Sequence, residues 1–236
     1  MSDSIKSLLF AALLCLACSL LLTAASSGLR GFQQQNIALD KQKNILKSVG
    51  LIDPYSTRDR SAIEALYAAK IKSFWVDEAG CIITGQQQSR GDLPIYLYLE
   101  KDDVAAYVIP IDSRGLWGRI MGYLALQNDG STISGFTVYK HSETPGLGGE
   151  IEQRWFQRNF VGKKIVNRAG AFVSIGIAKG SAREALDSEA QLNYVDGISG
   201  ATLTGKLLSA GIRDTLLDYE PVSVQFRSHQ AYCTQN

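Results

Sequence analysis

An uncharged run from Ser7 to Ala25, nineteen residues rich in Leu, Ala and Phe, most constrains what this chain can fold into. As a helix rising about 1.5 Å per residue, it matches the roughly 30 Å hydrocarbon layer of a membrane. A cleaved signal peptide is the alternative, since Lys6 precedes the run and Thr23-Ala24-Ala25 resembles a cleavage site. The run is longer than a usual signal core, which favours a retained transmembrane helix.

The apolar run divides the chain into four predicted parts. The segment from Gly28 to Gly50 is polar with scattered apolar residues, as expected of a helical stalk, and Asp53-Pro54 ends it. The predicted parts are a short tail (1–6), a transmembrane helix (7–25), a helical stalk (26–52) and an extracytoplasmic domain (53–236).

Charges near the run leave its orientation open. Lys6 lies before it, whereas Arg30, Lys41 and Lys43 follow it. A simple count of these cations would place the large domain in the cytoplasm. Long domains translocate largely regardless of such charges, so the count decides little.

Composition and absent motifs exclude several classes of function. The net charge of +1 argues against a nucleic-acid-binding surface. The chain has no Walker loop and no dinucleotide fingerprint, and its two histidines stand outside hydrolase or zinc motifs. Cys15 and Cys18 are interpreted as small residues of the membrane helix, and a disulfide between Cys81 and Cys233 stays open.

Periodicity beyond residue 60 predicts an α+β domain. Asn128-Asp129-Gly130 between two apolar runs is a strong hairpin signal. Helices before and after the hairpins indicate flanking helices around an antiparallel sheet. The pattern predicts helices at 61–71, 153–160 and 203–219, a loop at 81–91, and strands at 95–99, 105–111 (ended by Pro110), 121–127, 132–140 and 173–177.

Two segments have the composition of a binding site. Asp196 to Leu203 places glycines and hydroxyls at the start of a helix, where free backbone N–H groups and the helix dipole favour an anion. A plain N-cap without a ligand is the common alternative. The segment from His141 to Glu150, with three glycines and a proline, predicts an irregular loop that exposes backbone N–H groups to a ligand.

Together, Glu143–Gly148 and Asp196–Thr202 resemble the two signatures of the FMN-binding domain whose flavin is phosphoester-linked to threonine. The resemblance extends over nearly the whole chain to the C subunit of the Na+-translocating NADH:quinone oxidoreductase, although residues 60–95 are somewhat short. The G subunit of the Rnf electron-transport complex shares both flavin motifs but is less similar in the stalk. The further similar segments are Asp3–Lys6, Gly28–Arg30, Ala38–Gln42, Gly115–Trp117 and Val161–Lys164.

The resemblance implies a covalent FMN on Thr202, attached by a flavin transferase, with Thr204 as the rival acceptor. A phosphodiester at a helix start agrees with the local physics. Lys179 is expected near the phosphate or the flavin ring. The other implied binding residues are Ser199, Gly200 and Ala201 in the loop, Glu143, Thr144, Leu147 and Gly148 around the flavin, and Trp117 against its ring.

The implied function is electron relay within a membrane complex. The resemblance places the FMN domain on the periplasmic side of the bacterial inner membrane, held by a single pass, with five partner subunits (A, B, D, E and F). Electrons would pass between redox centres towards ubiquinone, coupled to Na+ export. The Rnf G subunit, a membrane-anchored flavin-binding regulatory module and a domain without flavin remain the alternatives.

Overall fold

The computed structural model describes residues 2–53, 59–83, 89–101, 103–228 and 234–235. The chain forms two compact units, Met1–Asp40 and Lys41–Asn236. Cys233 lies outside the described residues, so its pairing with Cys81, which the sequence leaves open, stays open.

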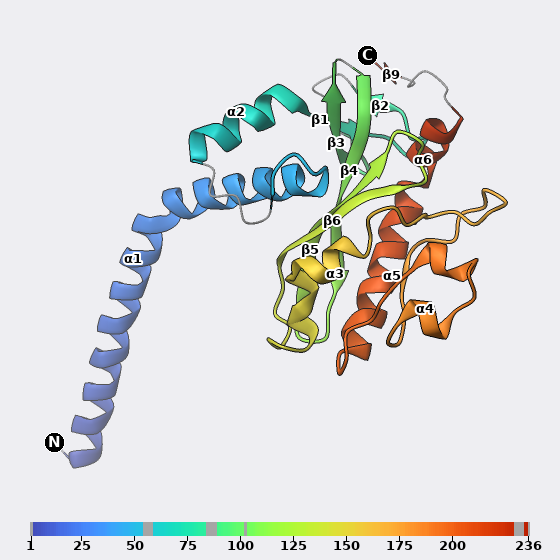
Figure 1. The fold of residues 1–236 in the computed structure, drawn as a ribbon. Helices are drawn as coiled ribbons and strands as arrows, with labels where there is room; N and C mark the ends of the chain where they lie inside the picture. Colours follow the sequence, from blue (N-terminus) through green and yellow to red (C-terminus); the bar gives the residue numbers. More distant parts are fainter. Residues whose placement is uncertain (1, 54–58, 84–88, 102, 229–233, 236) are drawn as a thin grey trace. The chain divides into compact units, whose positions relative to one another are not determined.

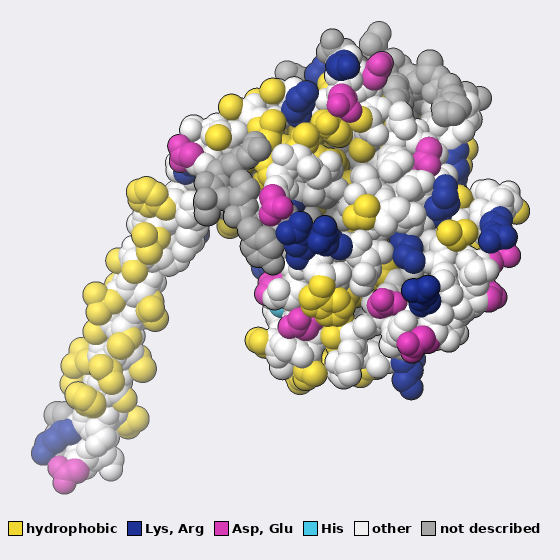
Figure 2. Space-filling model, in the orientation of Figure 1, with side chains coloured by type: hydrophobic (Ala, Val, Ile, Leu, Met, Phe, Trp, Pro, Cys, Tyr) yellow, Lys and Arg dark blue, Asp and Glu magenta, His cyan; other side chains and the backbone are white. Residues whose placement is uncertain are grey.

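One long helix, α1 (Asp3–Ser48), forms the first unit and extends into the second. By length and composition it is able to cross a membrane. Figure 2 shows hydrophobic side chains along its N-terminal part, where large residues such as Leu21 are 72% exposed. The predicted spanning segment and most of the predicted stalk are helical. The division between membrane and stalk stays a prediction.

The second unit is built on a mostly antiparallel sheet, as predicted (Figure 1). In the described part of the chain its strand order is β6-β5-β4-β3-β1-β2-β9, and only β2 and β9 pair in parallel. The strands are β1 (Ile71–Val76), β2 (Ile82–Ile83), β3 (Leu93–Glu100), β4 (Asp103–Arg114), β5 (Arg119–Gln127), β6 (Ile133–Lys140) and β9 (Thr234–Gln235).

Apart from α2, which precedes β1, the remaining helices and short elements follow β6 along the chain. A small parallel pair, β7 with β8, stands apart from the main sheet. The remaining elements are α2 (Arg60–Lys70), η1 (Gly148–Glu152), α3 (Arg154–Arg158), β7 (Gly176–Ile177), α4 (Ala182–Ala185), η2 (Ala190–Asn193), β8 (Tyr194–Val195), α5 (Thr202–Asp218) and α6 (Glu220–Arg227).

The sheet has a core on each face because side chains alternate along its strands. On one face α5 packs along β4, and Ser113 Oγ donates a hydrogen bond to Leu207 O at 3.0 Å. On the other face the end of α1 is buried, and Thr137 Oγ1 donates to Asn44 O at 3.3 Å. Gly135 lies so close to Ser48 that a Cβ would collide with its backbone. The last turns of α1 therefore belong to the folded domain.

The hairpin predicted at Asn128–Gly130 joins β5 to β6. Gly130 adopts φ +62°, and Asp129 Oδ1 accepts hydrogen bonds from the N–H groups of Ser131 and Thr132 at 2.9 and 2.8 Å. These bonds hold the turn in the register that pairs Leu126 with Ile133. The turn predicted from these residue types is therefore the turn that forms in the structure.

Pro110 lies inside β4, so the prediction that it ends the strand is wrong. Beyond Val108, β4 pairs with β5 alone, and Pro110 opposes Tyr123 there. A proline fits a strand where one side has no partner strand, because its missing N–H then breaks no ladder bond.

Two other elements are shorter than predicted. The strand expected at 173–177 forms only at β7, because Ser174 has a left-handed backbone with φ +71°. The helix expected at 153–160 is limited to α3. The helices expected at 61–71 and 203–219 correspond to α2 and α5 within one residue at each end.

Candidate functional site

A cavity of about 340 Å³ lies where three loops meet the start of α5. The first loop joins β4 to β5, the second joins β6 to η1, and the third precedes α5. Eight of the ten sequence-predicted site residues line this cavity. Its walls are Leu116, Trp117, Glu143, Thr144, Leu147, Gly148, Gly200, Ala201, Thr202, Leu203 and Thr204.

The start of α5 has no side-chain cap. Ala201 occupies the N-cap position, so the alternative of a Ser or Thr N-cap is not what the helix uses. Gly200 before it has φ +75°, a conformation that favours glycine. The first N–H groups of any α-helix lack intrahelical partners, and here no capping side chain takes their place. This helix start can therefore accept an anion.

The two candidate threonines differ in access. Thr202, the first residue of α5, is exposed and makes no side-chain hydrogen bond among the described residues. Thr204 is 2% exposed, and its hydroxyl donates a 2.5 Å hydrogen bond to Glu143 Oε2. Thr202 thus offers a free hydroxyl to the cavity, whereas the Thr204 hydroxyl is already bound.

Glu143 joins the three segments of the cavity. Its side chain is 4% exposed, and Oε1 accepts a 3.0 Å hydrogen bond from the Trp117 N–H while Oε2 holds Thr204. A Cβ at Gly115 would lie 2.5 Å from Oε1, and one at Gly148 would lie 2.8 Å from Oε2. Both glycines are therefore required for the carboxylate to reach its partners.

Large apolar side chains surround the mouth of the cavity. Trp117 is 70% exposed, and Leu116, Leu147 and Leu203 are each between 44% and 57% exposed. Such a set beside an exposed hydroxyl provides surface for a flat apolar ring. Leu116 and Leu203 are not among the predicted site residues, although each is adjacent in sequence to one of them.

Ser199 and Lys179 do not line the cavity, although both are predicted to bind the cofactor. Both side chains are exposed. Lys179 follows β7, and the Gly197 N–H donates to Gly180 O at 2.7 Å, which places this loop beside the flavin motif. The backbone of the loop that carries Lys179 lies beside the flavin motif, but the Lys179 side chain does not line the cavity.

The geometry permits one kind of chemistry best. An uncapped helix start, a free threonine hydroxyl and an apolar rim suit a molecule with a phosphate at one end and a planar ring at the other. The described residues contain no group of acidic, His or Cys side chains that could hold a metal ion. The cavity therefore defines a site for an anionic, ring-bearing cofactor.

Comparison with known protein families supports this class of site. A family model described as FMN-binding domain matches residues 115–217, which include all three cavity segments. The chain is thus a flavin-binding domain preceded by a helix long and apolar enough to anchor it in a membrane.

Two curated relatives and one solved structure carry the identification further. The C subunit of the Na(+)-translocating NADH-quinone reductase from Yersinia pestis is 33% identical, covering 86% of this chain and 85% of that protein. Its Vibrio anguillarum counterpart is 30% identical, covering 91% and 89%. The crystal structure of the Parabacteroides distasonis counterpart superposes with a TM-score of 0.70 at 31% identity, covering 86% and 98%. The chain belongs to the family of C subunits of the Na+-translocating NADH-quinone reductase, an oxidoreductase complex.

Proposed function

We propose that this chain carries FMN in phosphoester linkage to Thr202 and relays electrons between redox centres of the complex. The observation that carries the proposal is the contrast between the two threonines. The Thr202 hydroxyl is exposed and free at an uncapped helix start, whereas the Thr204 hydroxyl is buried against Glu143.

The residues around Thr202 fit a phosphodiester. The free N–H groups at the start of α5 would donate to its oxygens, and the helix dipole favours its single negative charge. Trp117, Leu147 and Leu203 would provide apolar surface for the ring, while Glu143 fixes the two loops that carry this surface. When bound, the flavin would supply one-electron chemistry. Because the linkage is covalent, the cofactor would not dissociate from the protein.

The family context supports the wider role. We infer that the domain lies on the periplasmic side of the bacterial inner membrane and that α1 holds it there. Five other subunits (A, B, D, E and F) would be its partners, and a flavin transferase would attach FMN during maturation. Electrons would pass through the flavin towards ubiquinone, coupled to Na+ export.

Covalent attachment is tested on denatured protein. The full chain is produced with a flavin transferase, separated on a denaturing gel and viewed under ultraviolet light. Wild type and Thr204→Val should fluoresce, and Thr202→Val should be dark. The mass of the peptide from Ser199 to Lys206 should increase by one FMN, less water. A fluorescent Thr202→Val protein would overturn the attachment site.

The relay is tested in the assembled complex. Purification through a tag on this chain should recover the five other subunits, and Thr202→Val should assemble normally but lose NADH-driven quinone reduction. A chain that purifies alone from its native membrane would favour the regulatory-module alternative. A C-terminal alkaline phosphatase fusion, active only in the periplasm, reports the side of the membrane.

A further inference from the structure

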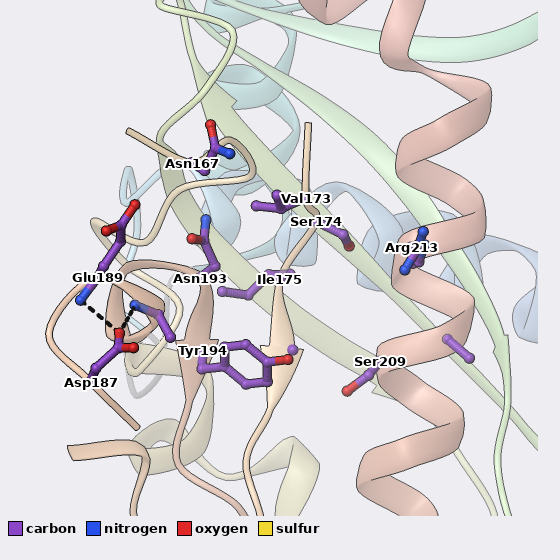
Figure 3. A pocket seen from close by; sticks show the side chains of 13 residues that line it. Asn167, Val173, Ser174, Ile175, Asp187, Glu189, Asn193, Tyr194, Ser209 and Arg213 are labelled. Atoms are coloured by element: carbon purple, nitrogen blue, oxygen red, sulfur yellow. Dashed lines mark hydrogen bonds between the residues drawn. The ribbon is translucent and has the colours of Figure 1, made fainter. Parts of the chain in front are cut away.

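A second cavity, of about 590 Å³, lies beside the middle of α5 (Figure 3). It is formed by the segment 167–176, by the region around η2 and by one side of α5. It shares no lining residue with the cavity at Thr202. Its walls are Asn167, Val173, Ser174, Ile175, Gly176, Asp187, Glu189, Ala190, Asn193, Tyr194, Ser209, Ala210 and Arg213.

Two features of Ser174 in this wall, its backbone conformation and its buried hydroxyl, are energetically unfavourable. Its backbone has φ +71°, one of two positive φ angles at non-glycine residues in the described part of the chain. Its side chain is 4% exposed, and its Oγ has no hydrogen-bond partner among the described residues. A left-handed serine and a buried hydroxyl without a partner each cost stability. Strained and unpaired groups of this kind cluster at ligand sites.

Arg213 brings a cation to the same wall. Its guanidinium is exposed on α5, and within the described residues no ion pair joins it to an acid. Figure 3 shows the Ser174 hydroxyl directed to the side of the cavity where Arg213 lies. An unpaired guanidinium beside a hydroxyl is a pair of donors suited to a carboxylate.

The opposite side of the cavity is acidic. Figure 3 shows Asp187 and Glu189 across from Arg213, with Asp187 Oδ1 accepting hydrogen bonds from the N–H groups of Glu189 and Ala190. A ligand with a second anionic group would meet like charge there. The cavity therefore favours a molecule with one negative end.

The floor between the two sides carries the Tyr194 ring and is largely apolar. The Tyr194 ring lies directly against Gly176, where a Cβ would be 2.5 Å from its Cε1 atom. Val173 and Ile175 continue this surface. Asn193 donates through Nδ2 to Lys164 O and Val166 O, which leaves Oδ1 as an acceptor beside the floor. A planar body would cover these groups.

We propose that this second cavity binds a small organic monocarboxylate with a flat, mostly apolar body. The carboxylate contacts the Arg213 guanidinium and the Ser174 hydroxyl, and the body lies on Tyr194, Ile175 and Val173. The site works without the flavin, because Thr202 and its cavity share none of these residues. Its failure and that of the flavin assignment are therefore distinguishable.

Benzoate is the probe, titrated against the full chain in detergent and followed by saturation-transfer NMR. Arg213→Gln should raise the dissociation constant at least about tenfold, the loss expected for one charge-assisted hydrogen bond. Lys206→Gln, an equal change of charge on the same helix, should leave it unchanged. Benzamide, uncharged but of the same shape, should bind at least about tenfold more weakly.

Ser174→Gly separates a ligand role from a structural one. Glycine accepts the left-handed backbone without strain and removes the buried hydroxyl, so the unfolding temperature should not fall. The affinity for benzoate should nevertheless fall about threefold or more, as expected for a lost hydrogen bond. Terephthalate, with its second carboxylate, should bind more weakly than benzoate, and Thr202→Val should bind benzoate like wild type.

Three results would overturn the proposal: no saturable benzoate binding to wild type, equal affinity in Arg213→Gln, or equal affinity for benzamide. Unchanged affinity in Ser174→Gly would likewise remove the serine from the site. Each variant is first checked for an unfolding temperature like that of the wild type, so that a loss of binding is not a loss of fold.

Discussion

Replacing Thr204 by valine tests how the walls of the flavin cavity are held together. Valine has nearly the shape of threonine, so the buried volume is kept and only the hydroxyl is lost. Glu143 Oε2 then loses its 2.5 Å hydrogen bond, while Oε1 keeps the bond from the Trp117 N–H. Because Glu143 is only 4% exposed, water replaces the lost donor poorly.

The expected loss follows from the kind of bond. A buried hydrogen bond to a charged group contributes about 2 kcal/mol. In a domain of this size each kcal/mol lowers the unfolding temperature by about 2–4 °C. Thr204→Val should therefore lower it by about 4–8 °C. Thermal unfolding of the full chain in detergent, followed by circular dichroism, measures this shift.

Two matched variants separate the hydrogen bond from other effects. Thr204→Ser keeps the hydroxyl and should lose much less stability than Thr204→Val. In the double variant with Glu143→Gln the losses should be less than additive, because the two side chains share one bond. Thr204→Val should still accept FMN, since the hydroxyl of Thr202 is independent of this contact.

The reasoning is refuted by either of two results. If Thr204→Val unfolds at the wild-type temperature, the bond to Glu143 does not hold the cavity together. If Thr204→Val is folded but takes up no FMN, while Thr202→Val takes it up, the roles of the two threonines are reversed.

Three further predictions concern other parts of the domain. Gly200→Ala should destabilise the domain more than Gly146→Ala and should reduce flavin attachment. Both glycines have positive φ, but of the two only Gly200 has a neighbouring atom 2.8 Å from the added Cβ. Denaturant unfolding measures the stability, and gel fluorescence measures the attachment. Burial has the largest single effect on the pKa of Asp129 and raises it, but the hydrogen bonds from Thr132 and Ser131 and the charge of Lys164 together lower this pKa overall. The stabilisation from Asp129 is therefore present above its unfolded pKa of about 4 and is lost as the pH falls below it. Asp129→Asn should flatten the fall in unfolding temperature between about pH 5 and 3, and an unchanged slope contradicts this. Tyr107→Phe removes the 2.8 Å hydrogen bond to Ser223 and should cost about 1 kcal/mol in urea unfolding.

Features set by neighbouring residues could be predicted from the sequence. The run from Ser7 to Ala25 is helical within α1, the turn at Asn128–Gly130 forms a hairpin, and α5 begins within one residue of its predicted start. In each case the deciding chemistry lies within a few residues: apolar length, turn-forming side chains or helical period.

The flavin motifs are an intermediate case. The two segments, Glu143–Gly148 and Asp196–Thr202, are recognisable only when they are taken together, and the structure brings most of their residues to one cavity. Lys179 is expected there too, but its side chain stays outside the wall. Periodicity does not say which way a lone lysine after a strand will point.

The sequence by itself determined most of the longer helices and strands, the membrane-length helix and the likeness to a flavin-binding family, because these depend on local pattern. Only the tertiary structure decided that Thr204 is bound by Glu143 across 61 residues, leaving Thr202 free. It alone showed the left-handed Ser174 beside the unpaired Arg213. Such pairings depend on how distant segments pack, and a one-dimensional pattern does not encode burial or the direction of a side chain.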